Sequence, residues 1–235
     1  MNLDIRRGEI LSLLGENGSG KTTLMNMLAG LYFPDSGHVY VDGEEVSIRS
    51  PKDSYNLGIG MIHQHFKLVD VFTAAENIAL GVREKGRYNL REIKKRIEEI
   101  CRKYGFEMNP DQKVYSMTVS QKQTLEIIKV LYRGADILIL DEPTAVLTPQ
   151  ETEKLFNIIK NMRDDGKSII IITHKLHEVL SVSDRVAILR RGEYIGDVPT
   201  SDATELSLTE MMVGEKVSLD IERPEPVNPE PRIVV

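Results

Sequence analysis

The sequence predicts an α/β protein with a mostly parallel β-sheet, an antiparallel β edge subdomain and an inserted α-helical subdomain. Three observations support this fold class. Wholly apolar runs at 137–140 and 169–172 are typical of parallel strands that are covered on both faces. A glycine-rich loop joins an apolar run to a helix-forming segment near the N-terminus. Between about 73 and 133, apolar residues recur at helical spacing.

The glycine-rich loop has the spacing G-x-x-x-x-G-K-[ST] of a phosphate-binding loop, the hallmark of P-loop NTPases. Its glycines let backbone N–H groups turn around a phosphate. The helix predicted over 21–29 points its N-terminus at the same anion. Lys21 can reach the β- and γ-phosphates, and the Thr22 hydroxyl can bind Mg²⁺. The loop residues assigned to the phosphate site are Gly15, Glu16, Asn17, Gly18, Ser19, Gly20, Lys21, Thr22 and Thr23.

Strand and turn patterns surround this loop in the first part of the chain. Met1–Arg7 is predicted as a strand that ends in a turn at Gly8. Asp42-Gly43 is a typical two-residue hairpin turn, and Ser50-Pro51 is typical of a helix start. The predicted strands of this region, besides the first, are 9–14, 38–41, 44–46 and 59–62.

Helical patterns follow between about 73 and 133. Thr73 and Glu76 have the spacing of a capping box, which predicts a helix start. Apolar residues on one face predict an amphipathic helix over 90–104, with a charged, solvated side. A further helix is predicted over 118–132. We expect these helices to form a subdomain inserted into the sheet domain.

Strands alternate with helices again in the last part of the chain. Thr148-Pro149 predicts a helix that stops at Gly166. Strands at 185–189 and 194–197 flank a turn, and a short helix is predicted over 209–213. Four prolines between 224 and 231 indicate a stiff linker, and 232–235 resembles the start of a strand. We therefore expect one domain over 1–214, and a linker with the start of a following domain over 215–235.

Composition limits the classes of function. The chain is 41% hydrophobic and 28% charged with a net charge of −6, which disfavours direct binding of nucleic acid. Its single cysteine, Cys101, excludes a disulfide framework and suits a reducing cytoplasm. We expect Cys101 to be a packing or surface residue rather than a nucleophile. No signal peptide or membrane-spanning run is present, so a membrane role would come through a partner.

A pair of carboxylates follows the apolar run 137–140. Ligands of open parallel sheets bind at the carboxyl ends of the strands, where Asp141 and Glu142 are expected to lie. Phosphoryl transfer to water needs a metal-holding acid and a group that activates the water. Asp141 would hold Mg²⁺ through water and Glu142 would be the general base. Acidic pairs also serve as helix caps, but the phosphate loop favours the catalytic interpretation.

With Leu-Asp-Glu-Pro-Thr at 140–144, the chain resembles an ATP-binding cassette (ABC) ATPase over residues 1–214. The resemblance implies ATP and Mg²⁺ as ligands. Gln64 matches the Q-loop glutamine, which touches the metal and the attacking water, and His174 matches the switch histidine, which binds the γ-phosphate. The implied catalytic residues are Glu142, His174, Gln64 and Lys21, and the implied metal ligands are Thr22, Gln64 and Asp141.

Several segments resemble the importers of simple sugars and, more closely, of nucleosides. These segments are 60–69, 76–78, 132–136 and 141–149. In that group two cassettes are fused in one polypeptide, and this chain would be the first. The resemblance implies an ATPase at the cytoplasmic face of the cell membrane. Its partners would be the second cassette, membrane permease subunits and, indirectly, a solute-binding protein, with no nucleic acid.

Three departures from the family pattern stand out. The signature Leu-Ser-Gly-Gly-Gln, which faces the partner's ATP, aligns with Met117 and the segment Thr118, Val119, Ser120 and Gln121. Val119 and Ser120 replace both glycines, so a Cβ would crowd a backbone contact to phosphate. The usual D-loop aspartate is Thr148. The aromatic that stacks on adenine would precede Asn2, so the N-terminus is expected to be truncated. Tyr32 and Tyr40 are expected in the core rather than as substitutes.

Two other functions remain open at this point. A soluble ABC ATPase acting on ribosomes or DNA is disfavoured by the negative charge and by the absence of a long coiled-coil insertion between Gln64 and Thr118. A nucleotide-gated binding module with poor hydrolysis is suggested by the altered signature. A GTPase is disfavoured because the guanine-reading pattern Asn-Lys-x-Asp is missing.

Overall fold

The central element is a six-stranded sheet in the order β4-β5-β6-β1-β7-β8, seen in a computed structural model that describes residues 2–80 and 89–215. Neighbouring strands run parallel except β8, which pairs antiparallel with β7. The strands are β1 (Ile10–Leu14), β4 (Ile59–Ile62), β5 (Ile137–Asp141), β6 (Ser168–Ile172), β7 (Arg185–Arg190) and β8 (Glu193–Pro199). The predicted fold class is confirmed.

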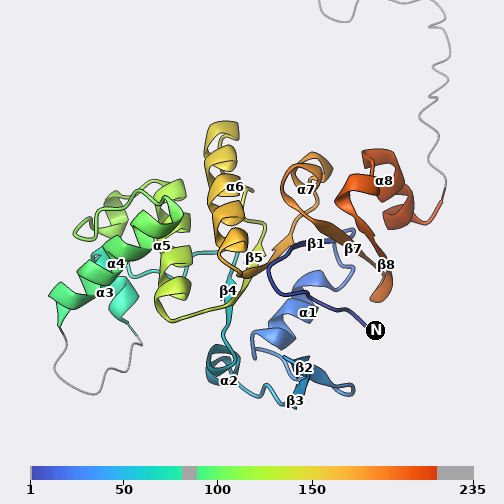
Figure 1. Ribbon diagram of the computed structural model, residues 1–235, viewed down its shortest axis with the longest axis horizontal. Helices are drawn as coiled ribbons and strands as arrows, with labels where there is room; N and C mark the ends of the chain where they lie inside the picture. The colour runs from blue at the N-terminus through green and yellow to red at the C-terminus, as the bar shows by residue number, and fades with distance from the viewer. Residues whose placement is uncertain (1, 81–88, 216–235) are drawn as a thin grey trace, which may run out of the picture.

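Successive residues of the central strands pack into different layers because side chains alternate across a strand. Leu11 and Leu13 face a cluster with Met25 of α1 (Lys21–Leu28) and the separate hairpin β2 (Val39–Val41) and β3 (Glu44–Val46). Ile10 faces the opposite cluster, which includes the apolar side of α6 (Pro149–Asp164). In Figure 1, α1 and the hairpin lie below the sheet, and α6 lies above it.

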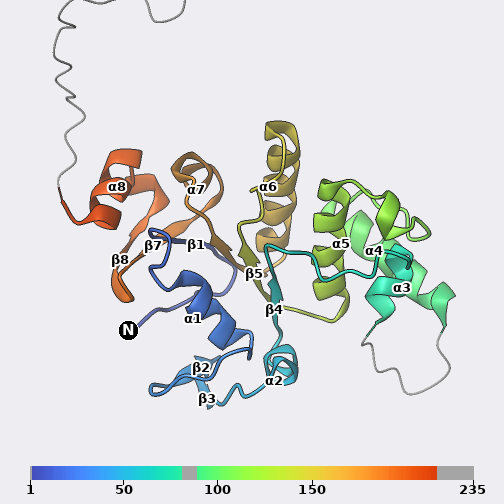
Figure 2. The ribbon, with the colours of Figure 1, turned by 180° about the vertical axis from the view of Figure 1, so that it is seen from behind.

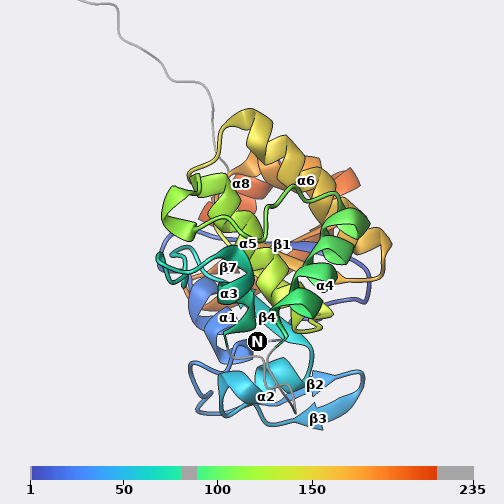
Figure 3. The same cartoon turned by 90° about the vertical axis from the view of Figure 1, so that its left-hand side faces the viewer.

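The helical insertion forms a lobe beside β4. It contains α3 (Ala74–Ala79), α4 (Leu90–Tyr104) and α5 (Val119–Tyr132), joined through a short 3₁₀ turn at Val114–Ser116. Figure 3 shows this lobe end-on, and Figure 2 shows it from behind. Helix α5 approaches β4 closely at Gly60, where an added Cβ would lie 2.1 Å from Cγ1 of Val130. The glycine therefore brings the lobe against the strand that leads to Gln64.

The C-terminal part covers the same face of the sheet as α6, at the end formed by β7 and β8 (Figure 1). Helices α7 (Leu176–Val182) and α8 (Glu205–Val213) share a core cluster with β1 and β7, formed by Leu14, Val179, Val186, Ile188 and Leu208. The remaining elements are α2 (Pro51–Asn56) and a 3₁₀ turn at Thr200–Asp202. No helix within 2–80 and 89–215 combines the length and apolarity needed to cross a bilayer.

Two local predictions differ from the structure. The strand predicted over 1–7 is wrong for residues 2–7, which lie in no strand. Backbone groups of this segment form hydrogen bonds with side chains instead of with a neighbouring strand. The Arg6 N–H donates to the Glu9 carboxylate, and the Asp4 carbonyl accepts from the Arg185 side chain. Helix α8 starts at Glu205 rather than 209, because Thr204 and Ser207 form a capping box. The linker and strand predicted over 215–235 lie, except for residue 215, outside the described residues.

Candidate active site

The carboxyl ends of β1, β4, β5 and β6 meet at one cleft of about 400 Å³. All six side chains predicted to form one wall of the site line it: Lys21, Thr22, Gln64, Asp141, Glu142 and His174. The other lining residues are Asn17, Gly18, Ser19, Gly20, Thr23, Ala145 and Ile172. Gly15 and Glu16 are not among them. The segment 118–121 also lies outside it.

The shape of the loop after β1 depends on Gly15. Its φ is +157°, and an added Cβ would lie 2.2 Å from the carbonyl oxygen of Leu189 and 2.4 Å from Oγ of Ser19. No side chain fits there. The turn between β7 and β8 supports the loop from behind, since the Gly192 N–H donates to the Ser19 carbonyl at 3.1 Å. The conformation of the loop thus depends on the glycine at position 15, and a hydrogen bond from the β7–β8 turn stabilises it.

Lys21 is buried inside the loop. Its Nζ donates to the carbonyl oxygens of Gly15 (2.7 Å) and Glu16 (2.9 Å). Burial lowers the pKa of Lys21, while the charges of Glu142 and Asp141 oppose this change. The amine is therefore held at the base of the cleft, beside the backbone N–H groups that would receive a phosphate.

Asp141 and Thr22 face each other across the cleft floor. Burial and the neighbouring charge of Glu142 raise the pKa of Asp141, whereas a hydrogen bond with Thr22 and the charge of Lys21 act in the opposite direction. A hydroxyl, a carboxylate and the Gln64 amide thus line the same cleft. These are oxygen donors of the kind that Mg²⁺ prefers when it also binds phosphates, so the residues fit this ion.

Glu142 has an unusual backbone and an incompletely bonded side chain. Its φ of +49° is costly for a residue with a Cβ, and such strain concentrates at functional sites. One carboxylate oxygen, Oε1, lies 2.8 Å from Nδ1 of His174. The other, Oε2, is buried and has no hydrogen-bond partner among the described residues. A carboxylate oxygen left open in a cleft of this kind can accept a proton from a bound water.

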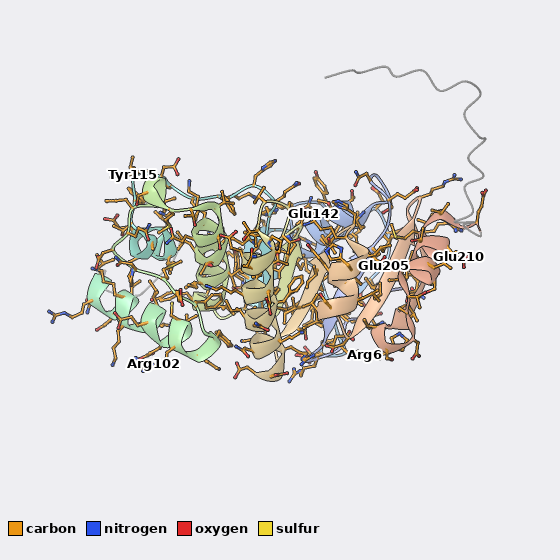
Figure 4. The ribbon with its side chains drawn as sticks, turned by 90° about the horizontal axis from the view of Figure 1, so that it is seen from above. Arg6, Arg102, Tyr115, Glu142, Glu205 and Glu210 are labelled. Atoms are coloured by element: carbon orange, nitrogen blue, oxygen red, sulfur yellow. The ribbon has the colours of Figure 1, made fainter. Side chains whose placement is uncertain are left out.

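The predicted signature residues lie at the start of α5. The Thr118 hydroxyl accepts a hydrogen bond from the Gln121 N–H at 3.2 Å, and Oε1 of Gln121 accepts from the Thr118 N–H at 2.9 Å. This capping box gives Thr118 a structural role that we did not assign from the sequence, although Thr118 and Gln121 have the S/T-x-x-E/Q spacing. Figure 4 shows Tyr115, just before this segment, and Glu142 along the same long edge of the molecule.

The expectation that Tyr32 and Tyr40 pack in the core is wrong. They are 54% and 60% exposed, because Tyr32 follows α1 at its surface end and Tyr40 points outward from the short hairpin. Cys101 is half-buried on α4, and burial, with the charge of Glu98, raises the pKa of its thiol to about 11. A thiol of this kind is a poor nucleophile at neutral pH, as the packing interpretation requires.

The segment that follows Gln64 is held by the helical lobe, a feature the sequence did not predict. Asn77, buried in α3, accepts from the Val69 N–H (2.7 Å) and donates to the Val69 carbonyl (3.0 Å). From α5, Glu126 accepts from the Lys67 N–H (2.6 Å), and Lys129 donates to the Lys67 carbonyl (3.1 Å). We call these three side chains the lobe clamp. The sequence signal that could have indicated this clamp is the presence of polar residues on the otherwise apolar faces of α3 and α5.

Comparison with known proteins adds three findings. The family model described as ABC transporter matches residues 1–145. The nucleoside import ATP-binding protein NupA of Lactococcus lactis subsp. cremoris is 52% identical over 225 residues, covering 95% of this chain and 44% of NupA. The glucose import ATP-binding protein TsgD13 of Haloferax volcanii is 44% identical over 253 residues, covering 95% of this chain and 46% of TsgD13.

The fold is also similar to solved structures. The dimeric structure of MJ0796, a bacterial ABC transporter cassette, superposes with a TM-score of 0.73 at 28% identity, covering 85% of this chain and 88% of that cassette. The chain spans less than half the length of NupA and TsgD13. Each of these two relatives therefore contains a long region that has no counterpart in this chain.

Proposed function

Because this chain belongs to the ABC transporter family, we propose that it is an ATP-binding and ATP-hydrolysing cassette that energises the import of a nucleoside. The observation that carries the proposal is the single cleft that gathers a phosphate loop, two carboxylates, a glutamine and a histidine. Each of these groups has a role in phosphoryl transfer to water.

In this proposal the backbone N–H groups of Gly15–Thr23 hold the phosphates of ATP, and Lys21 neutralises the β- and γ-phosphates. Mg²⁺ would be held by Thr22, Gln64 and Asp141, and when bound it supplies positive charge to the phosphate oxygens. Glu142 accepts the proton of the attacking water through its open oxygen. His174 holds Glu142 in place and donates to the γ-phosphate.

We infer that a second cassette closes over the cleft. The segment 118–121 lies outside the cleft and would face the ATP of that partner. The dimeric form of the similar MJ0796 cassette supports this arrangement. The relatives are more than twice as long as the chain, which supports a second cassette fused C-terminally. Because Val119 and Ser120 replace glycines in the signature, the altered signature would weaken the partner's site, so the two sites would be unequal.

The partner site can be tested through Thr118. Thr118→Ser keeps the helix cap and the hydroxyl, whereas Thr118→Ala removes both and weakens α5 by about 1 kcal/mol. In the intact protein, Thr118→Ser is therefore the variant expected to retain turnover. If Thr118→Ala keeps its full turnover and only its stability falls, the residue caps the helix without contacting ATP.

We propose that permease subunits dock beside the lobe clamp, at the cytoplasmic face of the membrane. A hollow at the junction of lobe and sheet is lined by apolar and charged side chains of both signs, including Tyr55, Met61, Lys67, Glu126 and Lys129. A permease segment seated there would contact the same backbone that carries Gln64. Movement of the lobe could then be linked to the state of the γ-phosphate, with a solute-binding protein delivering the nucleoside outside.

The higher identity to NupA than to TsgD13 supports a nucleoside over a sugar. Uptake of radiolabelled nucleosides, with ribose and glucose as comparison solutes, tests this in a strain that lacks the gene and in the same strain after complementation. We expect nucleoside uptake to return with the gene. Restored uptake of a sugar but not of nucleosides would reassign the solute.

The altered signature favours one second candidate, a nucleotide-gated binding module that hydrolyses ATP poorly. Such a module would bind ATP with Mg²⁺ and close, but it would release phosphate far more slowly than the intact transporter imports solute. Measurement of phosphate release and solute uptake on the same preparation separates the two functions.

A further inference from the structure

A partly buried hydrogen-bond network joins the loop that follows Glu142 to the helix that follows His174. Nζ of Lys175 donates to the Thr144 carbonyl (3.0 Å), to Oγ1 of Thr144 (3.2 Å) and to Oε1 of Glu178 (2.9 Å). The Thr144 hydroxyl donates to Oε2 of Glu178. Thr144 is 1% exposed and Glu178 is 5% exposed, whereas the Lys175 side chain is 29% exposed, so water competes least for the bond between Thr144 and Glu178.

The network is fully satisfied. An ammonium group has three donors, and each donor of Lys175 has an acceptor within it. Both carboxylate oxygens of Glu178 are also used. Lysine has no acceptor atom, and Lys175 therefore makes no cap to the helix that it precedes. Its position at the start of α7 is explained by the network and not by helix capping.

The network lies just beyond the end of a strand ladder. Strands β5 and β6 are paired up to Asp141 and Ile172, and the Glu142 N–H still donates to the Ile172 carbonyl at 2.9 Å. The two backbones then leave the sheet as loops that carry Glu142 and His174. The network connects these loops again at Thr144 and Lys175. Neither Lys175 nor Glu178 lines the cleft.

We propose that Lys175 and Glu178 are positioning residues for hydrolysis of ATP. They fix the loop at 142–144 against the start of α7, so that Nδ1 of His174 stays at hydrogen-bonding distance from Glu142. This inference rests on the proposed function. It adds Lys175 and Glu178 to the site as residues that act through Glu142 and His174. The loop that carries the unpaired oxygen of Glu142 is then held in one place at the cleft.

The test compares Lys175→Met and Glu178→Gln in the intact protein, with His177→Gln as a control on the exposed side of the same helix. We measure kcat for ATP hydrolysis with Mg²⁺ and the Kd of a fluorescent ATP analogue. Each of the two variants should lower kcat by about 100-fold, the cost of a displacement of about 1 Å, with little change in Kd. His177→Gln should change neither quantity.

A double-mutant cycle separates positioning from a general effect on the fold. In a Glu142→Gln background, adding Glu178→Gln should cause no further loss in single-turnover rate, since the base to be positioned is absent. An equal loss in both backgrounds, a normal kcat in the single variants, or loss of analogue binding together with turnover would each overturn the proposal. A wild-type protein without ATP hydrolysis would instead contradict the proposed function.

Discussion

Oε1 of Glu142 lies 2.8 Å from Nδ1 of His174, although the two residues are 32 positions apart and follow different strands. Adjacent strands β5 and β6 bring them together, and both side chains line the same cleft as Lys21. The second oxygen of Glu142 is buried without a hydrogen-bond partner in the described part of the chain. One oxygen is thus bonded to His174, and the other is left unpaired among the described residues.

Replacement of Glu142 by Gln should lower kcat for ATP hydrolysis by about 100-fold or more, since an amide cannot take a proton from water. The Gln side chain keeps the size of the residue, so the affinity for ATP should change little. Phosphate release and binding of a fluorescent ATP analogue measure the two quantities. Undiminished turnover would remove Glu142 from the mechanism.

Gly15→Ala should destabilise the protein more than Gly18→Ala. Both glycines have positive φ, so both variants carry a cost of about 1–2 kcal/mol from the backbone. Only at residue 15 does the new Cβ also meet a carbonyl oxygen, that of Leu189, at 2.2 Å, while nothing lies within 4 Å at residue 18. Thermal unfolding without nucleotide compares them, and an equal loss for both would show that the loop moves freely away from β7.

Asn77→Ala should release the segment that follows Gln64. The variant leaves both backbone groups of Val69 without their side-chain partner, at a cost of about 1–3 kcal/mol. Hydrogen exchange of the Val69 amide should speed up markedly, while amides of β6 stay protected. Asn77→Asp separates the two bonds, because its carboxylate can still accept from the Val69 N–H but cannot donate to the Val69 carbonyl. Unchanged exchange in Asn77→Ala would mean that Glu126 and Lys129 hold the segment alone.

The thiol of Cys101 should react slowly. Its pKa is raised to about 11, so little thiolate is present at pH 8, and the rate should rise as the pH approaches that value. We expect alkylation by iodoacetamide at pH 8 to be at least about tenfold slower than for free cysteine. Peptide mass spectrometry of the native protein measures the rate, with the urea-unfolded protein as control. Rapid native labelling would show that Cys101 is accessible as thiolate.

The sequence was sufficient wherever structure depends on near neighbours. The loop at Gly15–Thr23 and the capping boxes at Thr73 and Thr148 are short patterns, and the structure confirms the helices they start. The fold class could be predicted for the same reason. A strand that is covered on both faces is wholly apolar, so its own residues identify it without knowledge of the neighbouring strands.

Features that depend on distant residues could not be predicted. Helix α7 was missed because it is short, its N-cap makes no side-chain hydrogen bond, and Glu178 bonds to Thr144 on another loop. The strand expected over 1–7 is absent over 2–7, where Arg185, far along the chain, donates to the Asp4 carbonyl. In the lobe clamp, Glu126 and Lys129 likewise bind a backbone about 60 positions away, a relation that no local pattern contains.

The central claim is that this cleft hydrolyses ATP, and turnover by the intact protein with Lys21 replaced tests it most directly. Phosphate release should be measured with Mg²⁺ for wild type and for Lys21→Ala, with Lys154→Ala on the exposed surface of α6 as control. We predict that Lys21→Ala lowers turnover by about 100-fold or more, because the buried ammonium neutralises charge on the transferred phosphate. Turnover equal to that of wild type and Lys154→Ala would contradict the account.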